Sequence, residues 1–273
     1  MDTSGTRPPS LPVLGPRCGS RCQHFCRHLH KASVSTHTSF FTRRGAAPYR
    51  QRWAAASREG KLFFACQEGQ VDAARLLLDN GAAVDRATED GRTPLYVACE
   101  NGHVDAVRLL LDKGADVNWA AQYGRTPLFV ACQEGQIDAA RLLLENGAEV
   151  NRADRYGYTP LFIACHVGRV DAARLLLDNG AAVDRAQKQG ATPLFITCVV
   201  GHIDLARLLL EKGAEVDRAT NTARGRTPLD IAKEEGHSAV VALLEKHRKP
   251  AAVVEGVVVG EPGLQEAEQE YPG

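Results

Sequence analysis

Apolar positions along the chain recur with a period of 33 residues. The run Arg-Leu-Leu-Leu begins at Arg75, Arg108, Arg141, Arg174 and Arg207. The motif Gly-x-Thr-Pro-Leu begins at Gly91, Gly124, Gly157, Gly190 and Gly225, at intervals of 33, 33, 33 and 35 residues. A fixed period of this length is the signature of a stacked repeat architecture. We therefore divide the middle of the chain into units 1 to 6: 57–89, 90–122, 123–155, 156–188, 189–223 and 224–248.

The residue pattern of each unit predicts two short helices followed by a loop. In unit 2, Thr93 is a suitable N-cap and Pro94 occupies the first helical position. Gly102 is expected to end this helix, and Val104 opens a second one whose apolar residues recur at helical spacing. After Gly114, an extended loop leads to the next Gly-x-Thr-Pro turn. A helix pair of this size cannot bury its apolar side alone, so the units are expected to stack.

Residues 93–118 carry Thr-Pro-Leu-Tyr, Ala-Cys, Gly-His, Leu-Leu-Leu and Gly-Ala-Asp-Val-Asn, and so resemble the ankyrin-repeat family. The resemblance covers residues 57–248. It implies an all-α fold, a solenoid of six helix-turn-helix units with projecting β-turn loops. Unit 1 departs from the pattern with Gly60-Lys61 in place of Thr-Pro, and unit 6 lacks the triple Leu. Divergent end units are expected because they cap the stack and face water.

Charge divides the chain into three parts, although the net charge is zero. Residues 1–57 hold nine Lys or Arg and one acid, and residues 250–273 hold five Glu and neither Lys nor Arg. We predict a disordered basic segment over 1–56, the repeat domain over 57–248 and a disordered acidic tail over 249–273. The first segment is rich in Arg, Ser and Thr, which is also the composition of an organelle transit peptide.

The basic segment contains residue types that bind metals. Four of them could form a tetrahedral zinc site: Cys18, Cys22, Cys26 and His28. Their spacing matches no specific zinc pattern, and the distant ligand pair that usually closes such a site is missing. We therefore favour a segment that merely contains Cys and His, and we expect no metal and no cofactor. A basic tail alone would bind nucleic acid only weakly and without specificity, so nucleic acid is not the expected partner.

Two columns of residues recur with the repeat. One consists of thiols and the other of aromatic rings: Cys66, Cys99, Cys132, Cys165 and Cys198; Phe63, Tyr96, Phe129, Phe162 and Phe195. Neighbouring units lie about 10 Å apart, too far for a disulfide between successive thiols. We predict that the thiols are buried packing residues, and we favour packing between units over a ligand stripe for the rings. Histidines at the turn between helices are expected to bond backbone groups: His103, His202 and His237.

Residues that differ between units are the candidates for partner contact, because the shared ones serve stacking. At the loop tips we predict a surface of aromatic and Arg residues, the types that dominate interface energetics: Trp119, Tyr123, Arg125, Arg155, Tyr156 and Tyr158. On the first helices of units 4 and 5, polar pairs change to His166-Val167 and Val199-Val200. We weigh a partner patch there equally with isolated surface valines. The resemblance implies a binding surface on the concave side, formed by first helices and loop tips.

Two asparagines resemble ankyrin positions that asparaginyl hydroxylation modifies. Asn118 and Asn151 each follow an acid and Val, with Leu eight residues upstream. The chain has no phosphate-binding loop and no Gly-x-Ser-x-Gly nucleophile motif. Nothing outside the repeats is large enough for a catalytic domain, so we do not expect an enzyme.

The sequence therefore predicts a monomeric scaffold or adaptor that binds another protein. Two alternatives stay open: a substrate-recruiting subunit of a larger enzyme complex, and a regulator whose basic head binds metal or nucleic acid. No stretch of about 20 apolar residues exists, so no membrane span is expected. Numerous reduced thiols favour an intracellular, cytoplasmic location, with organelle import through residues 1–56 as the alternative.

Overall fold

The computed structural model describes residues 57–248 of the 273-residue chain. The predictions made for residues 1–56 and 249–273, including the zinc ligands, lie outside this range. Within it there are α-helices, one 3-10 turn and no strand: α3 (Arg58–Gln67), α4 (Val71–Asp79), α5 (Pro94–Asn101), α6 (Val104–Asp112), η1 (Gln122–Gly124), α7 (Pro127–Glu134), α8 (Ile137–Glu145), α9 (Pro160–Val167), α10 (Val170–Asp178), α11 (Pro193–Val200), α12 (Ile203–Glu211), α13 (Pro228–Glu234) and α14 (Ser238–His247).

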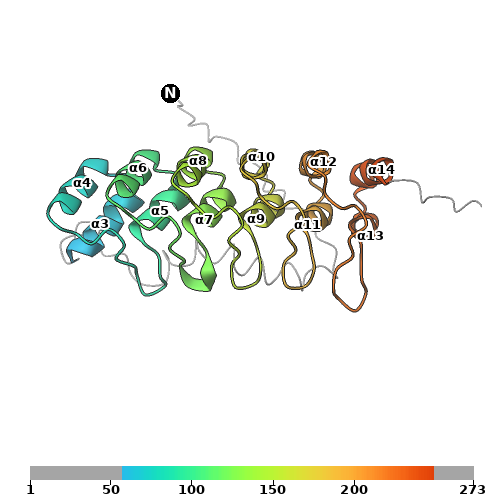
Figure 1. Cartoon of the computed structure of the whole chain (residues 1–273), viewed down its shortest axis with the longest axis horizontal. Coiled ribbons are helices and arrows are strands. Elements are labelled where there is room, and N and C mark those ends of the chain that lie inside the picture. The colour runs from blue at the N-terminus through green and yellow to red at the C-terminus, as the bar shows by residue number, and fades with distance from the viewer. Residues whose placement is uncertain (1–56, 249–273) are drawn as a thin grey trace, which may run out of the picture.

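The helices form an elongated array of two layers (Figure 1). The first helices of the units lie in one layer: α3, α5, α7, α9, α11 and α13. The second helices lie in the other: α4, α6, α8, α10, α12 and α14. Each first helix packs against the first helix of the next unit and the second helix of its own unit. Long loops project from the array on the side of the first helices. The predicted all-α solenoid is confirmed.

Local sequence determines where the first helices begin and end. The Thr93 side chain accepts a hydrogen bond from the Tyr96 N–H at 3.2 Å, and Pro94 stands at the first helical position. The same Thr-Pro cap begins α7, α9, α11 and α13. Each such cap contributes about 1 kcal/mol. Gly102 ends α5 in the left-handed conformation that favours glycine, as predicted.

The repeated thiols lie in the core. Cys66, Cys99, Cys132, Cys165 and Cys198 are all free and buried. Burial raises the pKa of every one of them, and it raises those of Cys66, Cys132, Cys165 and Cys198 to about 12. The thiols therefore stay protonated at neutral pH and fill space as small hydrophobes. The packing role predicted for them is confirmed.

The aromatic column also packs between units. Phe129 and Phe162 are fully buried, and Tyr96 and Phe195 are nearly so. Phe63 stays half-buried in unit 1, which among the described residues has a neighbouring unit on one side only. The column is therefore part of the core, as we favoured.

Two of the three turn histidines link neighbouring units through the backbone. His103 Nε2 lies 2.9 Å from the carbonyl oxygen of Gln67, and His237 Nε2 lies 3.2 Å from that of Val199. Because a carbonyl only accepts, Nε2 carries the proton in both rings. The predicted backbone bonds are confirmed for these two residues.

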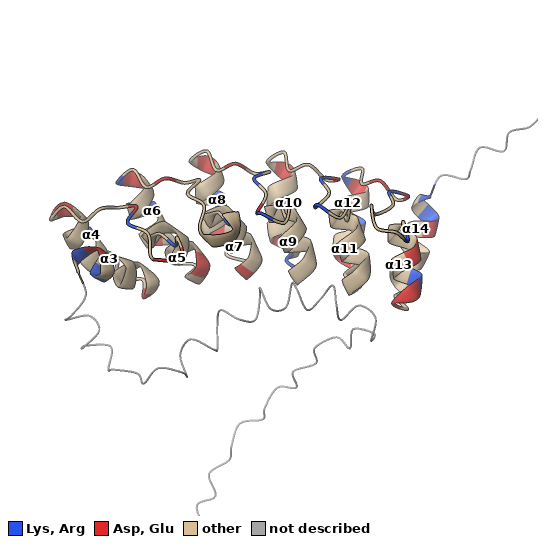
Figure 2. Ribbon diagram, turned by 90° about the horizontal axis from the view of Figure 1, so that it is seen from below, with Lys and Arg blue, Asp and Glu red and all other residues tan. Residues whose placement is uncertain are grey.

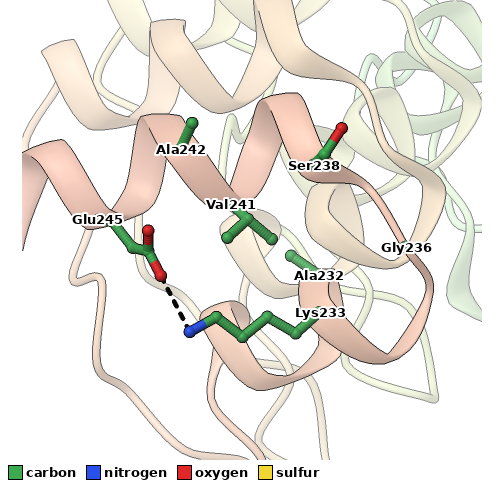
Figure 3. A pocket seen from close by; sticks show the side chains of 7 residues that line it. All are labelled: Ala232, Lys233, Gly236, Ser238, Val241, Ala242 and Glu245. Atoms are coloured by element: carbon green, nitrogen blue, oxygen red, sulfur yellow. Dashed lines mark ion pairs between the residues drawn. The ribbon is translucent and has the colours of Figure 1, made fainter.

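A polar pair covers the C-terminal end of the array. At the position where the inner units have a core Cys, unit 6 has Lys233, and at the position of the third Leu it has Glu245. The Lys233 Nζ lies 2.9 Å from Glu245 Oε1, beside an open hollow of about 400 Å³ between α13 and α14 (Figure 3). Within residues 57–248 no further unit covers this end, and a polar face is what such an end requires.

Candidate protein-binding surface

Backbone hydrogen bonds connect the loop tips, residues 86–92, 119–125, 152–158, 185–191 and 218–226, into one row. One bond joins each neighbouring pair, with N···O distances of 2.7–3.2 Å: Gln122 to Asp90, Arg155 to Tyr123, Lys188 to Tyr156 and Asn221 to Gln189. At Gly157, with φ of 88°, an added Cβ would lie 2.9 Å from the Lys188 nitrogen, so only glycine fits. The tips thus form a continuous and rigid edge, which is a good base for a binding site.

Near the middle of this edge, Arg155 lies against two tyrosine rings whose centroids are 6.3 Å apart. Its guanidinium carbon is 3.8 Å from the ring centroid of Tyr123 and 4.7 Å from that of Tyr156. Arg155 also donates a hydrogen bond to the Tyr156 hydroxyl. Tyr123 remains 37% exposed and Tyr156 39%. We call these three residues the tyrosine–arginine stack; its side chains are held in place and still reachable from solvent.

Two of the predicted tip residues face the helices instead of solvent. Tyr158 is half-buried, and its ring stacks on Phe162 with centroids 4.9 Å apart. The Arg125 side chain is only 12% exposed and lies over the Phe129 ring at 5.3 Å. Both residues stand directly before the Thr-Pro cap, where the side chain turns toward the first helix. Both residues are therefore less exposed than predicted, and their contact with a partner stays a prediction; the Tyr158 ring lies 5.9 Å from that of Tyr156.

A buried carboxylate shapes the same tip. Asp154 Oδ1 accepts hydrogen bonds from the backbone N–H groups of Tyr156 at 2.8 Å and Tyr158 at 3.0 Å. Its Oδ2 lies 3.9 Å from Arg125 Nε. Burial raises the pKa of Asp154, although the two N–H groups and Arg125 favour the carboxylate. Asp154 was not among the predicted site residues, but an Asp that bonds the N–H two residues on is the mark of an Asx-turn, which would have identified it.

Trp119 is fixed at the neighbouring tip. Its indole Nε1 donates to the carbonyl oxygen of Gly91 at 3.1 Å, and the residue is 37% exposed. The polar end of the ring is therefore satisfied while part of the apolar face remains open. Trp119 is placed as predicted, at an exposed loop tip.

The predicted apolar patch on the first helices is smaller than expected. Val199 is only 4% exposed and belongs to the core. The equivalent position of unit 3 buries Gln133, so a side chain at this position can pack against the neighbouring unit. The exposure predicted for Val199 is therefore wrong. His166, Val167 and Val200 are half-buried, and a partner contact there stays a prediction.

The two asparagines join successive loops. Asn118 Oδ1 accepts the N–H of Glu149 at 2.9 Å, and Asn118 Nδ2 donates to the Gly147 carbonyl at 3.3 Å. Asn151 makes the same pair of bonds one unit later. Both side chains thus have a structural role in the array, and their hydroxylation stays a prediction.

The described residues contain neither a cluster of metal-binding side chains nor a membrane-spanning helix. No group of three or more His, Cys, Asp and Glu in residues 57–248 is placed to hold a metal ion. Among the helices of the same residues, none is long and apolar enough to cross a membrane.

Stacked helix pairs with hydrogen-bonded loops define a class of repeat protein built for recognition over an extended surface. A model of the ankyrin repeats, in three copies, matches residues 57–120, 117–187, 153–220 and 183–253. These matches span more than half of the chain, which therefore belongs to the ankyrin-repeat family. Among curated proteins, no sequence matches the chain. Ankyrin repeats are in general protein–protein interaction modules.

Proposed function

We propose that this protein is a scaffold or adaptor that binds another protein through its loop edge, with the tyrosine–arginine stack at the centre of the contact. The observation that supports this most is the position of Arg155, held against Tyr123 and Tyr156 while both rings stay more than one-third exposed. Tyr and Arg are enriched among residues that dominate interfaces. Side chains fixed in advance also lose little freedom on binding.

We infer no catalytic role for the array. The carboxylate with a raised pKa at the loop edge, Asp154, has a side chain that is 0% exposed, so substrate cannot reach it. The thiols are buried in the core, and burial raises their pKa. Unpaired thiols in this number support an intracellular location, because secreted proteins of this size usually pair their cysteines.

The test uses the full chain as bait in affinity capture, with the Tyr123→Ala/Tyr156→Ala variant beside the wild type. We expect the variant to lose the proteins that the wild type retains. The matched control is Arg108→Ala/Arg141→Ala, at exposed positions of α6 and α8 on the opposite side of the array. Both variants should keep the free energy of unfolding within about 1 kcal/mol of the wild type, since the changed residues lie at the surface.

A third variant separates the two candidate surfaces. Val167→Ser/Val200→Ser changes the first helices of units 4 and 5 and leaves the loop edge intact. If it abolishes capture while the tyrosine variant does not, the partner binds the first helices, and the proposal for the loop edge is wrong. Equal capture by the wild type and the tyrosine variant also contradicts the proposal.

A further inference from the structure

The last two loop tips carry charge of one sign. Residues 185–190 and 218–226 contain five basic residues and no acid, whereas the first tip, 86–92, contains two acids. Figure 2 shows the blue segments in the loops that follow α10 and α12. We call these residues the basic ridge: Arg185, Lys188, Arg218, Arg224 and Arg226.

Three residues of the ridge have no acidic partner within residues 57–248. Arg218 lies 3.9 Å from Glu215, and Arg226 pairs with Glu234. Arg185, Lys188 and Arg224 are exposed, and none of them forms an ion pair in that part of the chain. Like charges gathered on one edge create a positive potential that attracts an acidic segment.

The chain leaves the described structure at one end of this ridge. Arg248, the last described residue, pairs with Asp217 through Nε and Oδ1 at 3.1 Å, and Asp217 directly precedes Arg218. The residues that follow, 250–273, hold five Glu and neither Lys nor Arg. The most acidic segment of the chain therefore begins beside its most basic loop.

Reach and charge both favour this segment as the occupant of the ridge. Twenty-four residues span up to about 80 Å when extended, and neighbouring units lie about 10 Å apart, so Arg185 is within reach. Attachment to the same chain also raises the effective concentration, into the millimolar range for a short linker, so weak contacts suffice. Residues 1–57, with nine basic residues and one acid, have the wrong sign.

We propose that residues 250–273 dock along the basic ridge, with their glutamates paired to Arg185, Lys188 and Arg224. This contact is independent of the partner proposed for the tyrosine–arginine stack. Charge pairs at the surface are screened by salt, with a Debye length of about 10 Å at 0.1 M and about 3 Å at 1 M. The docked segment is therefore expected at low ionic strength and lost at high ionic strength.

The experiment treats the full chain with a carbodiimide, which joins a carboxylate to an amine in direct contact. Mass spectrometry then measures the initial rate at which glutamates of 250–273 become linked to Lys188. A mixture of unlabelled and isotope-labelled chains separates links within one chain from links between two. The test variant is Arg185→Glu/Arg224→Glu, which keeps Lys188 as the reporter. The matched control is Arg108→Glu/Arg141→Glu on the outer helices.

We expect links within one chain at Lys188, formed faster than at Lys113, which lies in unit 2 and pairs with Asp79. The test variant should lower the Lys188 rate by about five- to tenfold, since each exposed pair contributes only a few-fold. The control should leave the rate unchanged. Equal rates at Lys188 and Lys113, links mainly between two chains, or a rate that the test variant does not lower would each overturn the proposal.

Discussion

Arg155 and Tyr123 come from neighbouring loops and are joined twice. The guanidinium carbon lies 3.8 Å from the ring centroid, and the Arg155 N–H donates to the Tyr123 carbonyl at 2.7 Å. Tyr123 is the one non-glycine residue of the described chain with positive φ, at 70°. That conformation costs on the order of 1 kcal/mol, so it persists only where the surroundings impose it. The two contacts with Arg155 supply this restraint at the centre of the loop edge.

Replacing Arg155 should loosen the stack measurably. We expect Arg155→Ala to lower the free energy of unfolding by about 1 kcal/mol, because two exposed cation–π contacts of about 0.5 kcal/mol each are lost. Urea denaturation followed by circular dichroism measures the change. Arg152→Ala is the control in the same loop; its pair with Glu149 is exposed and should contribute less than about 0.5 kcal/mol. Equal losses in the two variants would show that the stack adds no stability.

Asp85 occupies the loop position that Asn118 and Asn151 occupy in the next two units, and it makes fewer kinds of hydrogen bond there. The Asp116 N–H donates to both oxygens of Asp85 at 3.1 Å, but a carboxylate has no donor for the next carbonyl. Asp85→Asn should add the equivalent, one unit earlier, of the hydrogen bond that Asn118 Nδ2 donates to the Gly147 carbonyl. We expect a gain of about 0.5–1 kcal/mol in the free energy of unfolding at pH 7, measured by urea denaturation.

The gain from Asp85→Asn should depend on pH. Burial raises the pKa of Asp85 in the folded state, so folding disfavours its ionised form. The resulting loss of folding stability is absent below the ordinary pKa of Asp, near 3.9, and develops as the pH rises through the pKa of Asp85 in the folded state. The stabilisation by Asn should therefore shrink when the pH is lowered to about 3. Asp79→Asn is the opposite control: Lys113 lowers the pKa of Asp79, so this variant should lose stability at pH 7 and lose less in acid.

Leucines of the same motif should differ in their effect on stability. Leu143 in α8 is fully buried, and Leu143→Ala should lower the free energy of unfolding by about 2–5 kcal/mol through a core cavity. Leu76 in α4 is 63% exposed, and Leu76→Ala should change it by no more than about 0.5 kcal/mol. Thermal melts of both variants would contradict this assignment if their midpoints shifted equally.

The polar end of the array should keep chains apart. Lys233→Cys/Glu245→Leu restores the residue types that inner units carry, and so creates an apolar end that can accept a unit of another chain. Such a contact is head-to-tail and does not close, so we expect concentration-dependent association in sedimentation velocity. The control, Lys212→Cys/Glu211→Leu, makes the same exchanges on the exposed side of the array. Association of both variants or of neither would contradict a capping role for the Lys233–Glu245 pair.

Features that recur from unit to unit were predictable from the sequence. The Thr93-Pro94 start and the Gly102 end of α5 follow from backbone chemistry within a few residues. Burial of the Cys and aromatic columns follows from the period together with residue type, because a small or apolar residue repeated from unit to unit packs against the same neighbours each time. The ankyrin resemblance then fixed the order of the helices and the loops.

Features that depend on side-chain direction were not predictable. Tyr156 and Tyr158 are two residues apart in one loop, yet the first is exposed and the second stacks on Phe162. The sequence shows only that both differ from the other units. Val199 was misplaced for the same reason: its burial depends on the neighbouring unit. The contact between Arg155 and Tyr123 joins two neighbouring loops, and the repeat period does not predict it.

The hydrogen-bonded row of loop tips also sets a scale of length. Neighbouring units lie about 10 Å apart, and a peptide in the polyproline II conformation advances about 3.1 Å per residue. Because this conformation has three residues per turn, a peptide lying along the edge would bring every third side chain, on one face, to the next tip. Because hydrogen bonds join the tips to one another, their spacing cannot adjust to a bound segment. A segment whose matching side chains stood two or four residues apart would lose register after one or two tips, so the edge selects for spacing as well as for residue type.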